Sequence, residues 1–231
     1  MGHGELNNAY RINMIKYTSP QLVHIPVEPV VLEGVLDIPE GAHALIIFAH
    51  GSGSSRHSKR NKYVAEVLRE VGLGTLLFDL LTREEDMIYE NRFDIPLLAK
   101  RLSSVTRWVK EQAQTTNLRI GYFGASTGAA AALIAAAEPA SEVGAIVSRG
   151  GRPDLAEQSL KRVKAPTLLI VGGDDHIVIQ LNQQAYNSMR AEKALRIIPG
   201  ASHLFEEPGA LEQVAHLAAE WFNKYLSKKR E

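Results

Sequence analysis

The sequence predicts an α/β fold in which helices cover both faces of a mostly parallel, twisted sheet. Three observations support this prediction. Strand-like and helix-like segments alternate along almost the whole chain. Several strand segments, most clearly residues 43–49, are nearly continuous apolar runs, as expected for strands buried on both faces of a parallel sheet. A β-rich stretch broken by a proline turn comes first and predicts an antiparallel hairpin at the sheet's edge.

Each expected element follows from its local pattern. The hairpin covers residues 21–39, where Pro26 is tolerated because an edge strand has a free side. Helical segments repeat apolar residues every three or four positions. After the hairpin we expect strands at residues 43–49, 74–79, 118–123, 143–148, 166–171 and 195–198. We expect helices at residues 59–71, 94–114, 129–138, 153–162, 178–191 and 206–226, and a polar loop near 82–91.

Composition narrows the class of protein. The 231 residues suit one well-buried domain, expected over residues 20–231 after a polar extension at 1–19. Lys+Arg and Asp+Glu balance at 26 each, so nucleic acid and anionic membranes are not expected partners. The chain has no cysteine, which excludes disulfides, thiolate metal sites and a Cys nucleophile. No signal-peptide pattern or membrane-length apolar run occurs, so we expect a soluble cytoplasmic protein.

One stretch carries the strongest chemical signal. A strand-like run at residues 118–123 leads into Gly-Ala-Ser-Thr-Gly at 124–128, and an alanine-rich helical run follows. This context predicts a nucleophile elbow, in which Ser126 has a strained backbone and its hydroxyl projects above the sheet. The N–H of Thr127 at the helix start then points at an incoming oxyanion. Alternatively, the glycines only allow close packing and Ser126 caps the helix.

The partners of an activated Ser are expected at the same edge of the sheet, because ligands bind beyond the carboxyl ends of parallel strands. Asp174 and Asp175 follow one expected strand, and His203 follows the next. A neutral imidazole can take the proton from Ser126 Oγ, and a carboxylate can orient that imidazole. The spacing is compatible with either Asp.

The chain order Ser, Asp, His and four motifs resemble the α/β-hydrolases of the dienelactone-hydrolase-like group, over residues 22–226. The motifs are HGSGSS at 50–55, GASTG at 124–128, GGDDHIV at 172–178 and PGASHLF at 199–205. The resemblance implies an α/β-hydrolase fold, and the short loops of this chain predict that it has no cap domain. The family pattern G-x-x-D-x-x-V aligns with Asp175, which it implies as the acid, with Asp174 as the alternative.

The resemblance also implies where the oxyanion hole lies. In this fold the loop after the first parallel strand supplies its second donor, which we assign to the backbone N–H of Ser52. Gly53 is the alternative donor and a candidate substrate contact, and His50 is expected to brace the loop. Dienelactone hydrolases proper use a Cys nucleophile, which this chain lacks. The resemblance therefore implies the fold and hydrolysis rather than that particular substrate.

Two arginines, Arg149 and Arg152, follow the strand after the elbow helix and are candidate substrate-binding residues. A guanidinium at the active edge can receive a substrate carboxylate through two hydrogen bonds. It can equally pair with Asp154 or with a carboxylate near Glu84. Both interpretations are open at this point.

These observations predict a serine hydrolase that cleaves small soluble carboxylic esters, thioesters or lactones through an acyl-enzyme. No cofactor or metal is expected. The same three residues would also serve an acyltransferase or a hydrolase of C–C or peroxy bonds, and a hydrolase-like protein can bind a ligand without catalysis. No loop is long enough for a helical lid or apolar enough for a lipase surface, which predicts an open site that favours short acyl groups.

Overall fold

The computed structural model describes residues 19–227. The expected extension at residues 1–19 therefore lies almost wholly outside the described residues. The strands are β1 (Gln21–Val27), β2 (Val30–Asp37), β3 (Ala44–Ala49), β4 (Gly74–Phe78), β5 (Arg119–Ala125), β6 (Val143–Arg149), β7 (Thr167–Gly172) and β8 (Lys193–Ile198). The α-helices are α1 (Lys59–Glu70), α2 (Arg83–Asp86), α3 (Ile95–Glu111), α4 (Thr127–Ala136), α5 (Glu157–Leu160), α6 (His176–Ser188) and α7 (Ala210–Leu226). Two 3₁₀ turns are η1 (Tyr89–Phe93) and η2 (Pro153–Ala156).

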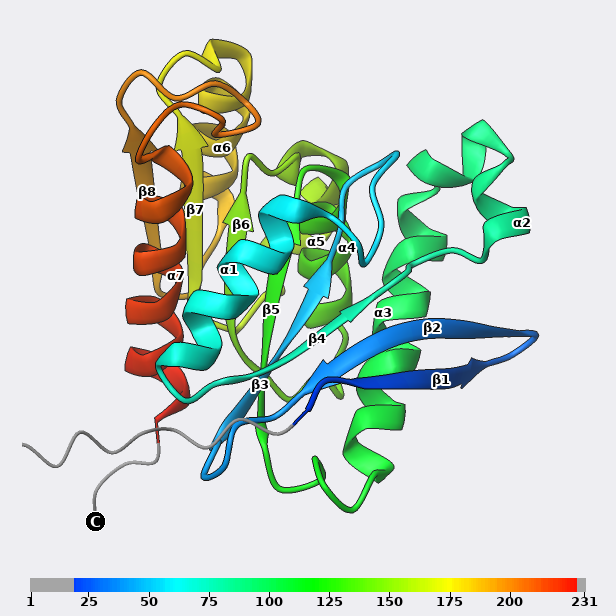
Figure 1. The fold of residues 1–231 in the computed structure, drawn as a ribbon. Helices are drawn as coiled ribbons and strands as arrows, with labels where there is room; N and C mark the ends of the chain where they lie inside the picture. Colours follow the sequence, from blue (N-terminus) through cyan, green and yellow to red (C-terminus); the bar gives the residue numbers. More distant parts are fainter. Residues whose placement is uncertain (1–18, 228–231) are drawn as a thin grey trace, which may run out of the picture.

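The eight strands form one twisted sheet in the order β1-β2-β4-β3-β5-β6-β7-β8 (Figure 1). Strands β3 to β8 are parallel to one another, whereas β1 and β2 pair antiparallel at one edge and β2 joins β4 antiparallel. The predicted fold class is confirmed. Because the six parallel strands share one direction, the loops after them all emerge at a single edge of the sheet.

Helices cover both faces of the sheet. Helices α1 and α7 pack together on one face over a core that includes Phe48, Phe123 and Phe222. Helices α3 and α4 cover the other face, where the hairpin also packs. Nine of the ten residues of α4 are buried, because this alanine-rich helix lies between the sheet and its neighbours. Its small side chains allow the close approach to β5 that the elbow requires.

The segment expected to be a polar loop at residues 82–91 is instead largely helical, and that expectation is wrong. Thr82 and Glu85 form a capping box, since the Thr82 side chain accepts the N–H of Glu85 while the Glu85 carboxylate accepts the N–H of Thr82. The other carboxylate oxygen of Glu85 lies 2.6 Å from Nη2 of Arg101, a buried residue of α3. These contacts hold α2 at the active edge of the sheet.

Two other elements differ from the prediction. The helix expected at residues 153–162 divides into the turn η2 and the short α5. Helix α7 begins at Ala210 rather than at residue 206, because Gly209 takes a left-handed conformation with φ of 79° and breaks the helical path. Within residues 19–227, no helix combines the length and the hydropathy needed to span a bilayer.

Candidate active site

Ser126 lies at a sharp turn between β5 and α4. Its φ of 50° and ψ of −120° are values that non-glycine residues rarely adopt. Three backbone hydrogen bonds hold this conformation. The Ser126 N–H donates to the Arg149 carbonyl at 3.2 Å, and the Ser126 carbonyl accepts from the N–H groups of Ala129 at 3.1 Å and Arg152 at 3.2 Å. The geometry is that of a nucleophile elbow.

The two glycines of the motif are required by close backbone contacts. A Cβ on Gly124 would lie 2.4 Å from the Cα of Ala129, inside the elbow itself. A Cβ on Gly128 would lie 2.2 Å from the carbonyl oxygen of Ala49, at the end of β3. Any larger residue would separate α4 from the sheet and move the serine.

Asp175 and His203, the expected acid and base, lie in the loops after β7 and β8. Asp175 Oδ2 lies 2.6 Å from Nδ1 of His203. Asp174 is exposed, and its backbone N–H donates to the Ala201 carbonyl, which helps to join the two loops. A Cβ on Gly172 would lie 2.3 Å from that same carbonyl oxygen. The loops can therefore approach closely only because residue 172 is a glycine.

Gly150 lies against His203, the expected base, and next to the residue that holds the backbone of Ser126. A Cβ on this glycine would lie 3.5 Å from Nδ1 of the His203 ring. Its neighbour Arg149 accepts the N–H of Ser126. The imidazole of His203 and Ser126 thus lie at the same edge of the sheet. Gly150 has no side chain that would press against the imidazole.

The expected oxyanion donors differ in whether their N–H groups already have a hydrogen-bond acceptor. Thr127 is the first residue of α4, where an N–H has no acceptor within the helix. The N–H of Ser52 donates to Thr127 Oγ1 at 2.9 Å, so in this structure it has a side-chain acceptor. Gly53 lies on an exposed turn with φ of 67°. The side-chain oxygen of Thr127 thus accepts the hydrogen bond of the Ser52 N–H, the group that was expected to face the substrate.

His50 is buried and makes two hydrogen bonds that fix its tautomer. Its Nε2 accepts the N–H of Leu80 at 3.0 Å, so Nδ1 carries the hydrogen and donates to the Gly51 carbonyl at 2.9 Å. Burial lowers the pKa of His50, opposed by the Gly51 bond and the Asp79 and Asp86 carboxylates. The imidazole is therefore neutral and joins the loops after β3 and β4, in the bracing arrangement that the sequence predicted.

The two candidate arginines have contrasting environments. Arg152 pairs with Asp154 through two hydrogen bonds, at 2.9 and 2.7 Å, which corresponds to the acidic-partner alternative. Arg149 is buried beside the Phe205 ring, and its Nε and Nη1 have no hydrogen-bond partner among residues 19–227. Burial, with a smaller effect of the nearby Arg60 cation, lowers the pKa of Arg149 to about 10. The guanidinium is still charged at neutral pH, without a paired carboxylate in this part of the chain.

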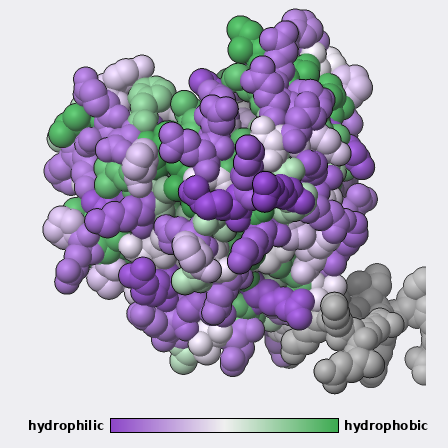
Figure 2. Space-filling model, turned by 180° about the vertical axis from the view of Figure 1, so that it is seen from behind, coloured by the Kyte–Doolittle hydropathy of each residue, from purple (hydrophilic) through white to green (hydrophobic). Residues whose placement is uncertain are grey.

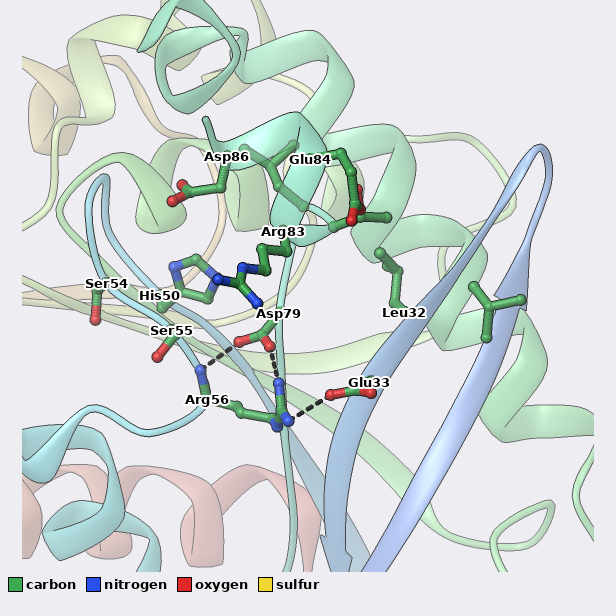
Figure 3. Close-up of a pocket in the computed structure, with 13 residues that line it drawn as sticks. Leu32, Glu33, His50, Ser54, Ser55, Arg56, Asp79, Arg83, Glu84 and Asp86 are labelled. Atoms are coloured by element: carbon green, nitrogen blue, oxygen red, sulfur yellow. Dashed lines mark hydrogen bonds and ion pairs between the residues drawn. The ribbon is translucent and has the colours of Figure 1, made fainter. Parts of the chain in front are cut away.

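A cavity of about 590 Å³, lined by both charged and aliphatic side chains, opens at the same edge (Figure 3). Its walls come from the start of β2, the loop after β3 and the connection after β4. Sequence reasoning missed this cavity and gave Asp79 no role. The only available signal was an aspartate directly after a predicted strand, a position that is common in parallel sheets.

Exposed apolar side chains border the active edge. Met87, Ile88, Tyr89 and Phe93 lie on the connection between β4 and α3 and are exposed. Ile177, at the start of α6, is also exposed. Figure 2 shows hydrophobic side chains on both raised parts of the upper edge of the molecule, with a lower region between them.

The parallel sheet, the strained serine and the Asp–His pair define an α/β-hydrolase. The chain belongs to the dienelactone hydrolase family, whose sequence profile matches residues 32–227. It is similar to a dienelactone hydrolase from Anabaena variabilis, with 57% identity and a TM-score of 0.87 over 91% of this chain and 100% of that chain. Est1E from Butyrivibrio proteoclasticus shares the fold at 17% identity, with a TM-score of 0.77 over 90% of this chain and 99% of its own.

Curated relatives from two strains of Mycobacterium tuberculosis are 58% identical over 204 residues. Both are named putative phosphoribosyl transferases. The match covers 88% of this chain but only 46% of each relative, so the chain spans about half the length of the curated relatives it matches.

Proposed function

We propose that this hydrolase is a serine esterase that cleaves small soluble esters, thioesters or lactones through an acyl-enzyme on Ser126. The observation that carries the proposal is the contact of 2.6 Å between Asp175 Oδ2 and His203 Nδ1. This hydrogen bond fixes the tautomer with a hydrogen on Nδ1, which leaves Nε2 as the base. The family and its esterase-like fold are consistent with hydrolysis.

The reaction proceeds in two balanced halves. Ser126 Oγ attacks the carbonyl carbon while His203 Nε2 takes the hydroxyl proton. The ester C–O bond then breaks, and the alcohol leaves with the proton from His203. Water attacks the acyl-enzyme in the same way and gives up a proton to His203. The carboxylic acid is released, and the proton returns to Ser126 Oγ.

The negative charge of each tetrahedral intermediate needs donors near the elbow. We assign them to the N–H groups of Thr127 and Ser52. Because Ser52 donates to Thr127 Oγ1 in the free protein, substrate binding must exchange that oxygen for the substrate oxygen. The exchange replaces one acceptor by another, so it leaves no donor unsatisfied.

The name of the curated relatives suggests a transferase activity. Because the matched region is less than half of each relative, we assign hydrolysis to the half that corresponds to this chain. More than half of each relative lies outside the match, so its name need not describe the matched part.

The test is the steady-state hydrolysis of p-nitrophenyl acetate by the Ser126→Ala variant. We expect kcat to fall by roughly four to six orders of magnitude, the scale seen when a triad nucleophile is removed. The far-UV spectrum and Tm should change little. Ser188→Ala, at the end of α6, is the matched control and should retain full activity. Near wild-type turnover by Ser126→Ala would disprove the proposal.

A further inference from the structure

The cavity shown in Figure 3 adjoins the proposed nucleophile through one shared loop. At the start of this loop, a Cβ on Gly51 would lie 3.1 Å from the Cβ of Ser126. The N–H of Ser52 reaches Thr127. The next residues, 54–56, form part of the cavity wall. A group bound in the cavity can therefore belong to the same molecule as a carbonyl at the serine.

The position in the sheet supports this connection. Strand β4, whose end carries Asp79 at the cavity, is separated from β5 only by β3. Two interstrand spacings amount to about 10 Å. That distance is comparable to the length of a small substrate. The volume of about 590 Å³ also lies within the range of roughly 300–1,000 Å³ that is usual for small-molecule sites.

The wall of the cavity combines charged groups, some of them fixed in place, with the apolar side chains of Val31, Leu32 and Leu81. The backbone N–H of Arg56 donates to Asp79 Oδ1 at 2.6 Å, and its guanidinium contacts both Asp79 and Glu33 (Figure 3). Arg83 also lines the cavity. Charged groups that are already paired lose little freedom when they bind a ligand.

The balance of donors and acceptors selects the ligand. The wall has four carboxylates and two guanidinium groups, together with the hydroxyls of Ser54, Ser55 and Thr82. An apolar group would cover the polar atoms of the wall that are not already paired, at a cost of roughly 1–3 kcal/mol for each one left without a hydrogen bond. An anionic group would face the surplus of carboxylates. Within residues 19–227, no three acidic or imidazole side chains are arranged to hold a metal ion.

We propose that this cavity binds the polyhydroxylated alcohol part of the substrate, so that the enzyme removes acyl groups from an acylated carbohydrate. A hydroxyl group can donate a hydrogen bond to a carboxylate and accept one from a guanidinium group at the same time. A polyhydroxylated ligand can therefore pair with both kinds of charged group in the wall. The inference rests on the proposed function. Cleavage breaks the C–O bond of the ester, and the sugar oxygen leaves with the proton from His203.

The experiment compares kcat/KM for three acetyl esters, with acetate release followed at constant pH. The substrates are a monoacetylated methyl glucoside, ethyl acetate and acetylcholine. We expect the sugar ester to exceed ethyl acetate by tenfold or more. Glu84→Gln and Arg83→Gln should reduce this ratio several-fold, mainly through KM. Glu90→Gln, an exposed acid on η1 that does not line the cavity, is the matched control and should leave the ratio unchanged.

Each other outcome has a definite meaning. If the sugar ester is no better than ethyl acetate while p-nitrophenyl acetate is still cleaved in a Ser126-dependent manner, the carbohydrate inference is wrong and the proposed function stands. A preference for acetylcholine would identify a cation site and overturn the inference. A ratio that the cavity variants do not alter would place the sugar elsewhere. Failure to cleave p-nitrophenyl acetate at all would refute the proposed function itself.

Discussion

Asp174 and Asp175 are adjacent in the sequence but have different environments. Asp175 contacts the imidazole of His203, whereas Asp174 is exposed and contributes only its backbone N–H to the loop. Sequence spacing could not distinguish the two, because both follow the same strand. The direction of each side chain depends on how the loop turns at Gly173 and into α6.

This difference gives a prediction at the residue scale. Asp175→Asn should lower kcat by roughly three to four orders of magnitude, because an amide favours the wrong tautomer of His203. Asp174→Asn, the matched neutral change one residue away, should stay within a few-fold of wild type. The measurement is kcat for p-nitrophenyl acetate at pH 8. A larger loss in Asp174→Asn would show that the acid has been assigned to the wrong residue.

At the scale of elements, the loops after β3 and β4 are joined by one neutral imidazole. His50 accepts the N–H of Leu80 through Nε2, and protonation would remove that acceptor. Burial lowers the pKa of His50 in the folded protein below its usual value of about 6.5. As the pH falls through about 6.5, the unfolded chain takes up a proton that the folded protein resists. Stability is therefore retained above this pH and lost below it.

The corresponding prediction concerns the pH dependence of unfolding. Between pH 8 and pH 5.5, His50→Gln should lose less free energy of unfolding than the wild type, because a glutamine amide can accept the Leu80 N–H without titrating. Urea denaturation at the two pH values measures the difference. His216→Gln, an exposed position on α7, is the control and should behave as wild type. An unchanged pH dependence in His50→Gln would contradict the bracing role.

The helices and strands also show which parts of the fold the sequence could predict and which it could not. The central strands were predictable because they are largely apolar runs, and the elbow because glycines flank the Ser126 motif. The helix α2 was missed because its polar side chains have no apolar periodicity. Its stability comes from the capping box at Thr82 and from the distant Arg101, and the second contact cannot be deduced from local sequence.

At the scale of the whole molecule, the direction of the parallel strands explains why the site was largely predictable. Loops after β5, β7 and β8 must emerge at one edge, so the serine, acid and base were expected together. The contacts between individual side chains could not be predicted from the sequence in the same way. That Thr127 Oγ1 engages Ser52, and that Arg152 is paired while Arg149 is not, depends on rotamers and distances set by the folded backbone.

The central claim is that Ser126 is an activated nucleophile, and covalent labelling tests it most directly. The protein is incubated with a fluorophosphonate probe, and the adduct is located by intact-mass and peptide mass spectrometry. We predict one adduct per chain, on Ser126, which is absent in Ser126→Ala and forms much more slowly in His203→Gln. No adduct, or an adduct on another residue that forms equally well in Ser126→Ala, would contradict the account.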